Sequence, residues 1–368
     1  MQQLKPRILI SGGGTGGHIF PAIAIADCIR EKHPEAEFLF VGALGKMEMQ
    51  KVPAAGYKIE GLPIAGFQRS LTTKNLSFPF KLLKSMNRAR KLVREFQPDL
   101  AIGTGGYASG PTLRAASKKG VPCLIQEQNS LPGITNRLLA KTVDTICVAY
   151  EGLEKYFPAE KIVITGNPVR KDLLDMDNKK EKAFRHFGLE AGRPVLLIIG
   201  GSQGARGINM AIKENTEKIS RLGIQVLWQS GKYFYDEALK AVRGKYERNI
   251  KVLEFINEMD LAYAAADILI SRAGAIAISE LCIVGKACIF VPLPTAAEDH
   301  QSMNAMALVD KKAALLVKNN EASSLLIKEL SALIHNRELQ KSLGDNIQKL
   351  ARPEATKKIT EEALKLIK

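Results

Sequence analysis

The residues best placed to do chemistry open the chain, in the stretch SGGGTGGH at positions 11–18. Its glycines match G-x-G-x-x-G, a pattern that lets backbone N–H groups approach an anion at a helix N-terminus. A dinucleotide-binding fold would also carry an acid at the end of its second strand, yet this strand ends Val41-Gly42-Ala43, and Glu37 lies at its start. No G-x-x-x-x-G-K-[ST] motif is present either. We therefore interpret the stretch as a phosphate-binding loop of another kind.

Two further features point to an anionic ligand. His18 follows the glycines directly, in the first turn of the predicted helix, so it faces whatever binds there. A second glycine-rich turn, Gly200-Gly201-Ser202-Gln203-Gly204, follows another apolar run. Two such loops on two Rossmann-like halves predict a cleft for a nucleotide-diphosphate substrate.

The elements that must position these loops are short apolar runs alternating with helical patterns. Such runs, apolar on both faces, predict parallel sheets covered by helices, and hence two doubly wound α/β halves. We place a first domain at 1–166, a second at 167–350, and a helix at 351–368 that packs back across the boundary. The predicted strands are RILIS (7–11), FLFVG (38–42), DLAIG (99–103), PCLIQ (122–126), TICVA (145–149), KIVITG (161–166), PVLLIIG (194–200), VLW (226–228), KVLEF (251–255), DILIS (267–271) and CIFVPL (288–293).

The composition of the 368 residues is that of a globular protein, with 46% hydrophobic and 25% charged residues. We expect neither a signal peptide nor a transmembrane helix, and a cytoplasmic compartment. The five cysteines are scattered, which suggests neither zinc nor a disulfide framework. A net charge of +15 favours an anionic partner, whether nucleic acid, phosphorylated substrate or acidic lipid.

Seven motifs, in order along nearly the whole chain, closely resemble the bacterial peptidoglycan N-acetylglucosaminyltransferases that convert lipid I to lipid II. The resemblance implies the GT-B fold, with two Rossmann-like domains facing across a cleft. It also implies inverting transfer of N-acetylglucosamine from its UDP donor to the C4 hydroxyl of the muramoyl sugar on undecaprenyl diphosphate. The motifs are GGGTGGHIFPAIAIA (12–26), GTGGYASGP (103–111), QEQNSLPGITNR (126–137), TGNPVR (165–170), GGSQGARGIN (200–209), SRAGAIAISE (271–280) and ARPEAT (351–356).

Matching the motifs residue by residue implies the site. SRAGAIAISE reads as a strand end turning into a helix, so its N–H groups suit a phosphate, and Glu280 would take the ribose hydroxyls. In the pair His300-Gln301 the register is open; we favour Gln301 on the donor sugar, because its amide both donates and accepts. The implied donor residues are Thr15, Gly16, Gly17, Asn129, Arg170, Ser202, Ile256, Ala275, Ile276, Ala277, Ile278, Ser279 and Glu280. The acceptor diphosphate would be bound by Gly13, Gly14, Gly105 and Gly106, with Thr15, Gly16 and Gly17 beside it.

Inverting transfer needs a base on the acceptor hydroxyl. His18 is the leading candidate, since an imidazole can take a proton at neutral pH. Glu127 is the competing base, Tyr107 would orient the acceptor, and His18 as a diphosphate ligand stays open. The one D-x-D match, Asp175-Met176-Asp177, we interpret as a solvated linker, so we expect no metal and no cofactor, with helix N-termini and Arg170 carrying the charge of the leaving group.

The segment 71–96 predicts a membrane contact. Leu82, Leu83, Met86, Ala89, Val93 and Phe96 recur at helical spacing and predict a core-facing stripe. Leu71, Leu76, Phe78 and Phe80 cluster just before it, among lysines and arginines, as suits an interface with anionic headgroups. We expect a peripheral protein on the cytoplasmic face of the cell membrane, with partners in a cell-wall synthesis complex.

Two other functions were weighed. Another GT-B enzyme, such as a UDP-N-acetylglucosamine 2-epimerase or a glycolipid glycosyltransferase, would share the donor site but not GGGTGGH, GTGGYASGP and QEQN together. A nucleic-acid-binding protein would explain the charge, but only Phe78 and Phe80 accompany the basic cluster and no recognised module appears. We therefore expect no nucleic-acid partner.

Overall fold

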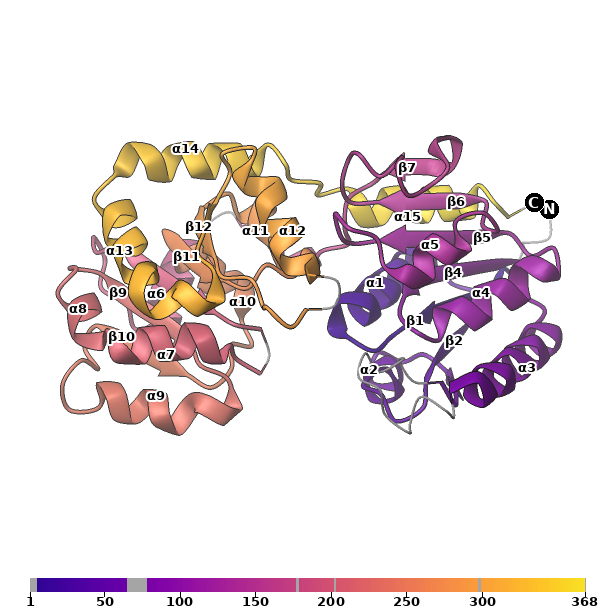
Figure 1. Ribbon diagram of the computed structural model, residues 1–368, viewed down its shortest axis with the longest axis horizontal. Helices are drawn as coiled ribbons and strands as arrows, with labels where there is room; N and C mark the ends of the chain where they lie inside the picture. The colour runs from indigo at the N-terminus through magenta and orange to yellow at the C-terminus, as the bar shows by residue number, and fades with distance from the viewer. Residues whose placement is uncertain (1–4, 65–77, 177–178, 202, 297–298, 368) are drawn as a thin grey trace. The chain divides into compact units, whose positions relative to one another are not determined.

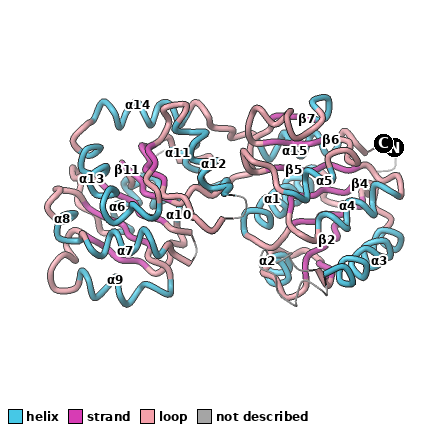
Figure 2. The backbone as a smooth tube through the Cα atoms, viewed as in Figure 1, coloured by secondary structure: helices cyan, strands magenta, loops and turns pink. Residues whose placement is uncertain are grey.

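The computed structural model describes residues 5–64, 78–176, 179–201, 203–296 and 299–367. The chain forms two compact units (Figure 1). Unit 1 comprises Met1–Val169 with Arg352–Lys368, and unit 2 comprises Arg170–Ala351. Each unit is an α/β layer structure with strands inside and helices outside (Figure 2). The C-terminal helix therefore belongs to unit 1.

In unit 1 the described residues form a parallel seven-stranded sheet in the order β3-β2-β1-β4-β5-β6-β7. The apolar runs predict its central strands, because strands covered on both faces bury every side chain. The strands are β1 (Arg7–Gly12), β2 (Glu37–Ala43), β3 (Ile59–Leu62), β4 (Leu100–Gly105), β5 (Cys123–Glu127), β6 (Thr145–Val148) and β7 (Ile162–Ile164). The helices are α1 (Gly16–Lys32), α2 (Glu48–Ala54), α3 (Phe78–Phe96), α4 (Ser109–Lys118), α5 (Ile134–Leu139) and α15 (Ala355–Leu364).

Helices cover both faces of this sheet. On one face α1 and α15 pack side by side, and Ile25 and Ile359 share a core with Ile8 and Ile10 of β1. On the other face Val93 of α3 packs in the core formed by the opposite side chains of the same strands. Helix α15 follows the whole of unit 2 in the sequence, yet it completes the hydrophobic core of unit 1.

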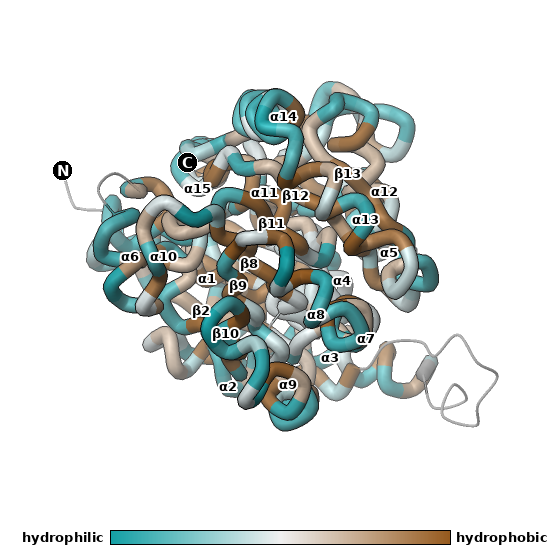
Figure 3. Tube along the Cα trace, turned by 90° about the vertical axis from the view of Figure 1, so that its left-hand side faces the viewer, coloured by the Kyte–Doolittle hydropathy of each residue, from teal (hydrophilic) through white to brown (hydrophobic). Residues whose placement is uncertain are grey.

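In unit 2 the described residues form a parallel six-stranded sheet in the order β10-β9-β8-β11-β12-β13. In Figure 3 strands β11 and β12 are hydrophobic, whereas the outer helix α6 is largely hydrophilic. The strands are β8 (Val195–Ile199), β9 (Gln225–Gln229), β10 (Ile250–Leu253), β11 (Ile268–Ser271), β12 (Ala287–Phe290) and β13 (Leu315–Leu316). The helices are α6 (Lys179–Phe187), α7 (Arg206–Glu214), α8 (Thr216–Ser220), α9 (Tyr235–Val242), α10 (Met259–Ala265), α11 (Ala275–Val284), α12 (His300–Val309), α13 (Ala322–Ile334) and α14 (Arg337–Gln348).

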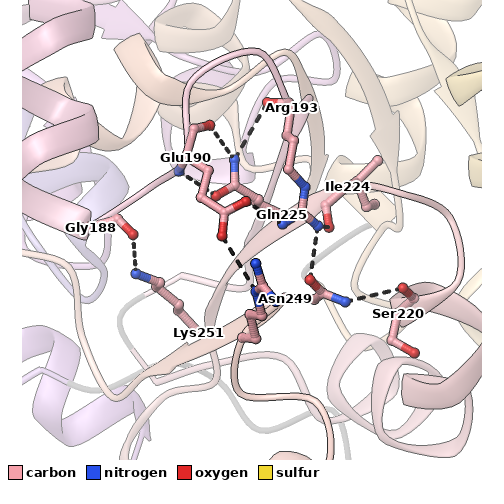
Figure 4. A network of polar contacts seen from close by, with 9 residues as sticks. Gly188, Glu190, Arg193, Ser220, Ile224, Gln225, Asn249 and Lys251 are labelled. Atoms are coloured by element: carbon pink, nitrogen blue, oxygen red, sulfur yellow. Dashed lines mark hydrogen bonds and ion pairs between the residues drawn. The ribbon is translucent and has the colours of Figure 1, made fainter.

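A polar network closes the amino-terminal edge of this sheet (Figure 4). The Gln225 side chain accepts from the Glu190 N–H at 2.7 Å and donates to the Glu190 carbonyl at 2.9 Å. Arg193 donates to the Asn249 side chain at 2.8 Å, and Asn249 donates to the Ser220 carbonyl at 3.2 Å. The network satisfies loop backbone at the amino ends of the strands.

The predicted fold class, two Rossmann-like parallel-sheet domains, is confirmed. One detail of the predicted core is wrong. Leu83 was placed on the buried stripe of α3, but 63% of it is exposed. The buried or half-buried residues recur from Leu82, and one further residue rotates the side chain by ~100° toward solvent. Within the described residues, no helix has the length and apolar character needed to cross a bilayer.

Candidate active site

The glycine-rich loops lie at the switch point of each sheet. In unit 1 strand β1 has β2 on one side and β4 on the other, and in unit 2 strand β8 lies between β9 and β11. The connections leave in opposite directions at these points, so the loops beyond the strands' carboxyl ends separate and leave room for a ligand.

In unit 1 the loops after β1 and β4 pack directly on one another. The Gly13 N–H donates to the Gly105 carbonyl at 3.2 Å. A Cβ on Gly106 would lie 2.3 Å from the Gly13 oxygen, and both Gly105 and Gly106 have positive φ. Two motifs far apart in the sequence therefore form one surface, in which glycine is required by close approach of the two backbones.

The start of α1 is the part of this surface suited to an anion. The helix begins at Gly16 with Thr15 as its N-cap, and its first turn contains no acidic residue. The first N–H groups of a helix have no intrahelical acceptor, so those of Thr15, Gly16 and Gly17 suit an external one. The amides of Gly13 and Gly14 instead donate to the Gly105 carbonyl and to the Glu48 carboxylate. The predicted contacts of Gly13 and Gly14 with an anion therefore do not use these amides, and the helix start remains a predicted anion contact.

His18 is held on both its backbone and its ring. Thr104 donates its hydroxyl to the His18 carbonyl at 2.8 Å. The ring Nδ1 lies 3.0 Å from the Gly13 oxygen and 3.4 Å from the Thr15 hydroxyl oxygen. Because a carbonyl only accepts, the shorter contact favours the tautomer with the proton on Nδ1. A neutral ring in this tautomer keeps its lone pair on Nε2, the nitrogen nearest to Gly105. Tyr107, in the turn after β4, is 48% exposed.

Glu127, the competing base, is buried at the end of β5 and bound on both oxygens. One oxygen accepts from the Asn129 N–H at 2.9 Å and from its side-chain amide at 3.2 Å. The other accepts from the Asn136 side chain at 2.8 Å and from the Gly133 N–H at 3.1 Å. With four donors around it, this carboxylate holds the loop that carries Asn129.

In unit 2 the start of α11, which follows strand β11, resembles the start of α1 in being suited to an anion. Its N-cap Gly274 is extended, no side chain caps the helix and its first turn has no acid, so the amides of Ala275, Ile276 and Ala277 suit an anion. Ile278 begins the intrahelical ladder by donating to the Gly274 carbonyl at 2.9 Å, and Ser279 donates its hydroxyl to the Ala275 carbonyl at 3.0 Å.

The loop after β8 is tied to the loop after β10 by one side chain. Gln229 donates to the Gly201 carbonyl at 2.9 Å and accepts from the Ile256 N–H at 3.2 Å. Ile256 itself is buried. Gln229 was not identified from the sequence. Of the two residues that it joins, Ile256 is a predicted donor contact and Gly201 precedes another, Ser202. Ser202 lies outside the described residues.

Glu280 forms a bidentate ion pair with Arg170. The Arg170 Nε lies 2.8 Å from one carboxylate oxygen and Nη2 lies 2.9 Å from the other, which also accepts from the Tyr263 hydroxyl at 3.2 Å. Burial alone would lower the pKa of Arg170, but the bonds and charge of Glu280 raise it above its ordinary value. Burial, and then the charge of Glu280, raise the pKa of Tyr263 well above its ordinary value. Arg170 and Glu280 were both predicted, and Tyr263 was missed.

The remaining predicted residues lie beyond β12. Gln301, in the first turn of α12, accepts from the Leu293 N–H at 2.9 Å through its amide oxygen, and His300 begins that helix.

Arg272, directly after β11, was not predicted. It donates to the carbonyls of Val291 and Pro292 at 2.8 and 2.9 Å, and its burial lowers its pKa to about 10.

In the part of the chain that the structure describes, no three His, Cys, Asp or Glu side chains gather where a metal ion could bind. Asp177 of the D-x-D match lies outside that part.

Comparison with known proteins identifies the family. Residues 8–148 match the glycosyltransferase family 28 N-terminal domain, and residues 195–359 match its C-terminal domain. The chain belongs to glycosyltransferase family 28.

Among curated relatives, the UDP-N-acetylglucosamine--N-acetylmuramyl-(pentapeptide) pyrophosphoryl-undecaprenol N-acetylglucosamine transferase of Cytophaga hutchinsonii is 54% identical over 368 residues, covering 100% of this chain and 99% of its own. A protein of the same name from Parabacteroides distasonis is 52% identical over 363 residues, covering 99% of each chain. The crystal structure of Acinetobacter baumannii MurG has a TM-score of 0.80 and 29% identity, covering 98% of this chain and 99% of its own. The resemblance inferred from the seven motifs is confirmed.

Proposed function

We propose that this chain transfers N-acetylglucosamine from UDP-N-acetylglucosamine to the C4 hydroxyl of N-acetylmuramoyl-(pentapeptide) diphosphoundecaprenol, so that lipid I becomes lipid II with inversion. The names of relatives that match it over the full length support this substrate pair. The observation that carries the proposal is the 3.0 Å contact between His18 Nδ1 and the Gly13 carbonyl, which favours a basic Nε2. His18 lies in the first turn of a helix whose first N–H groups suit an anion.

In the reaction, the acceptor diphosphate binds the amides at the start of α1. The Nε2 atom of His18 takes the proton of the C4 hydroxyl while that oxygen attacks the anomeric carbon of the donor. The bond to UDP breaks on the opposite face, which inverts the anomeric centre. The departing diphosphate is stabilised at the start of α11, where helix N–H groups and the dipole favour negative charge, with Arg170 as a nearby cation. Glu280 binds the ribose.

The direct test is transfer of radiolabelled N-acetylglucosamine from the UDP donor to a lipid I analogue with a shortened prenyl chain. Product should form with the muramoyl acceptor and be absent when its C4 hydroxyl is replaced by hydrogen. The same assay with a chelator tests metal dependence, and we expect the rate to persist. Absence of product with the intact acceptor, together with epimerisation of UDP-N-acetylglucosamine, would instead support the 2-epimerase alternative.

We also propose that helix α3 docks unit 1 on the cytoplasmic face of the cell membrane, which makes the protein peripheral. The described part of the helix exposes two large apolar side chains close together, Phe80 at 76% and Leu83 at 63%. Lys81 and Lys84 are exposed beside them. Apolar side chains among cations suit insertion at an anionic interface, where each cation near the surface contributes about 1 kcal/mol. Leu71, Leu76 and the side chain of Phe78 lie outside the described part.

Sedimentation with liposomes of graded phosphatidylglycerol content tests the docking. Phe80→Ser/Leu83→Ser and Lys81→Glu/Lys84→Glu should both lose binding and activity on full-length lipid I, yet keep activity on the short-chain analogue. Lys328→Glu/Lys341→Glu, which changes two exposed lysines of unit 2, is the matched charge control. Binding that ignores lipid charge, with all variants alike, would contradict the proposal.

A further inference from the structure

A buried carboxylate lies beneath the glycine-rich loop of unit 1. Glu48, the first residue of α2, is fully buried. One of its oxygens accepts from the Ala43 N–H at 3.0 Å and the other from the Gly14 N–H at 2.9 Å. Two oxygens facing two N–H donors is the pattern that an ionised carboxylate satisfies. No motif in the sequence marks this residue.

The neighbouring glycines make room for that carboxylate. A Cβ on Gly13 would lie 2.2 Å from a Glu48 carboxylate oxygen, and a Cβ on Gly42 would lie 2.5 Å from its Cγ. Either contact is far inside van der Waals distance, so both positions require glycine for a protein contact. Part of the G-x-G-x-x-G pattern therefore makes room for Glu48, whereas the glycines at the start of α1 belong to the proposed anion contact.

The contact reaches His18 through a single peptide group. The Gly13–Gly14 peptide is trans, so its N–H and C=O point in opposite directions. The N–H donates to Glu48, and the C=O accepts from His18 Nδ1 at 3.0 Å. The three groups form one hydrogen-bonded series, in which a carboxylate acts on an imidazole through a backbone amide.

We propose that Glu48 is a positioning residue that fixes the tautomer of His18, an inference that rests on the proposed role of His18 as the base. Hydrogen bonds in series polarise one another, so the carboxylate strengthens the Gly13 carbonyl as an acceptor of the Nδ1 proton. This is the part that an orienting carboxylate plays in a catalytic triad, here carried by a peptide.

Glu48 also prevents this peptide from flipping. Glycine at both 13 and 14 leaves the backbone free to rotate, and a flipped peptide would turn its N–H toward Nδ1. His18 would then hold its proton on Nε2 and could not act as a base there. The flipped carbonyl would face the carboxylate oxygen of Glu48, where two acceptors repel. The negative charge at position 48 therefore selects the peptide orientation that keeps Nε2 basic.

The substitution Glu48→Gln tests the proposal sharply, because a glutamine side chain can donate to the flipped carbonyl. We expect ¹⁵N spectra of histidine-labelled protein to show the Nδ1–H tautomer of His18 in the wild type and a gain of the Nε2–H tautomer in Glu48→Gln. The His18 signals are assigned as those lost in His18→Ala. Asp144→Asn is the matched control: Asp144 also accepts from a backbone N–H, that of Cys123 at 2.8 Å, but at the start of β5, away from the loop.

Kinetics separate this role from a structural one. Glu48→Gln should lower turnover by about 10–100-fold, less than the ~10²–10⁴-fold expected for loss of the base, and leave the donor KM within about twofold. In a His18→Ala background Glu48→Gln should add little, since its effect passes through the ring. Equal effects of Glu48→Gln in the two backgrounds, or an unchanged tautomer, would overturn the proposal.

The spectra need no activity, so they also separate this inference from the proposed function. A wild-type His18 with its proton on Nε2 would overturn the inference even if lipid II is formed. A wild-type tautomer as expected, in a protein that transfers no sugar, would instead refute the proposed function. If Glu48→Gln does not fold, the same spectra are recorded for Glu48→Asp, whose carboxylate is one methylene shorter. If Glu48 acts on His18 through the peptide, this variant should keep part of the turnover of the wild type and part of its Nδ1–H tautomer.

Discussion

Replacement of Glu280 by alanine should raise the donor KM by at least tenfold and leave the acceptor KM nearly unchanged. Glu280 lies in the second turn of α11 and is 6% exposed. One carboxylate oxygen accepts from the Arg170 Nε, and the other accepts from the Arg170 Nη2 and from the Tyr263 hydroxyl. A carboxylate offers about four lone-pair sites. The oxygen that accepts from the Arg170 Nε therefore keeps the capacity to accept from a ribose hydroxyl.

The size of the effect follows from the charge on Glu280. A hydrogen bond to an ionised group contributes about 1.5–3 kcal/mol, which corresponds to roughly 10- to 150-fold in affinity. Loss of the carboxylate should cost the fold about 1–3 kcal/mol, because the buried Tyr263 hydroxyl loses its acceptor. The Arg170 side chain is 42% exposed and can be hydrated when the pair is broken, so the protein should stay folded. The loss should appear in binding of the donor and not in the amount of folded protein.

Steady-state kinetics with the donor and the acceptor varied in turn, together with calorimetric binding of UDP, measure this prediction. Glu280→Gln keeps the shape of the side chain and should weaken donor binding less than Glu280→Ala. Tyr263→Phe removes one donor to Glu280 and leaves its charge, so we expect only a few-fold change. Unaltered donor kinetics in Glu280→Ala would remove Glu280 from the ribose site, and an equal rise in both KM values would indicate general disruption.

Three further predictions concern other parts of the chain. His18→Ala should lower turnover about 10²–10⁴-fold in the transfer assay; a rise in acceptor KM with turnover nearly intact would make the ring a diphosphate ligand instead. Glu127→Gln leaves buried donors unmatched, so its Tm by calorimetry should fall by roughly 2–12 °C; an unchanged Tm with turnover abolished would return Glu127 to the role of base. Burial raises the pKa of Cys123, Cys147 and Cys282 to about 12, so these thiols should resist iodoacetamide at pH 8. Mass spectrometry should find Cys28, which is partly exposed, labelled instead. Rapid labelling of Cys123 would contradict the described burial.

The sequence predicts the centre of each sheet better than its edges. Strand β8 is apolar at every position and β1 is apolar through its centre, because helices cover both faces, and that pattern is visible in the chain itself. The edge strands β3 and β13 were missed, although the edge strands β7 and β10 were predicted. β13 has only two residues and both are partly buried, so it leaves little pattern in the sequence. Leu83 was misplaced for a related reason: apolar character alone does not tell a buried position from an exposed one.

For the site, the sequence identifies the loops but not the side chains that anchor them. The glycine motifs and His18 are contiguous in the chain, so they can be found from spacing. Glu48, Gln229 and Tyr263 come from other elements and reach the loops only after the sheets have formed. Even within a motif, spacing cannot tell which amides face a ligand, and those of Gly13 and Gly14 donate to protein acceptors.

The two units anchor the loop of their first strand in opposite chemical senses. In unit 1 the carboxylate of Glu48 accepts from the Gly14 N–H, and the carbonyl of the same peptide contacts the His18 Nδ1. In unit 2 the amide of Gln229 donates to the Gly201 carbonyl and so leaves the loop's N–H groups to other acceptors, with no added charge. A base becomes cationic as it takes a proton, whereas a leaving diphosphate becomes more negative. In the proposed mechanism, the carboxylate thus lies in the unit that stabilises the protonated base, and the neutral amide in the unit that stabilises the leaving anion.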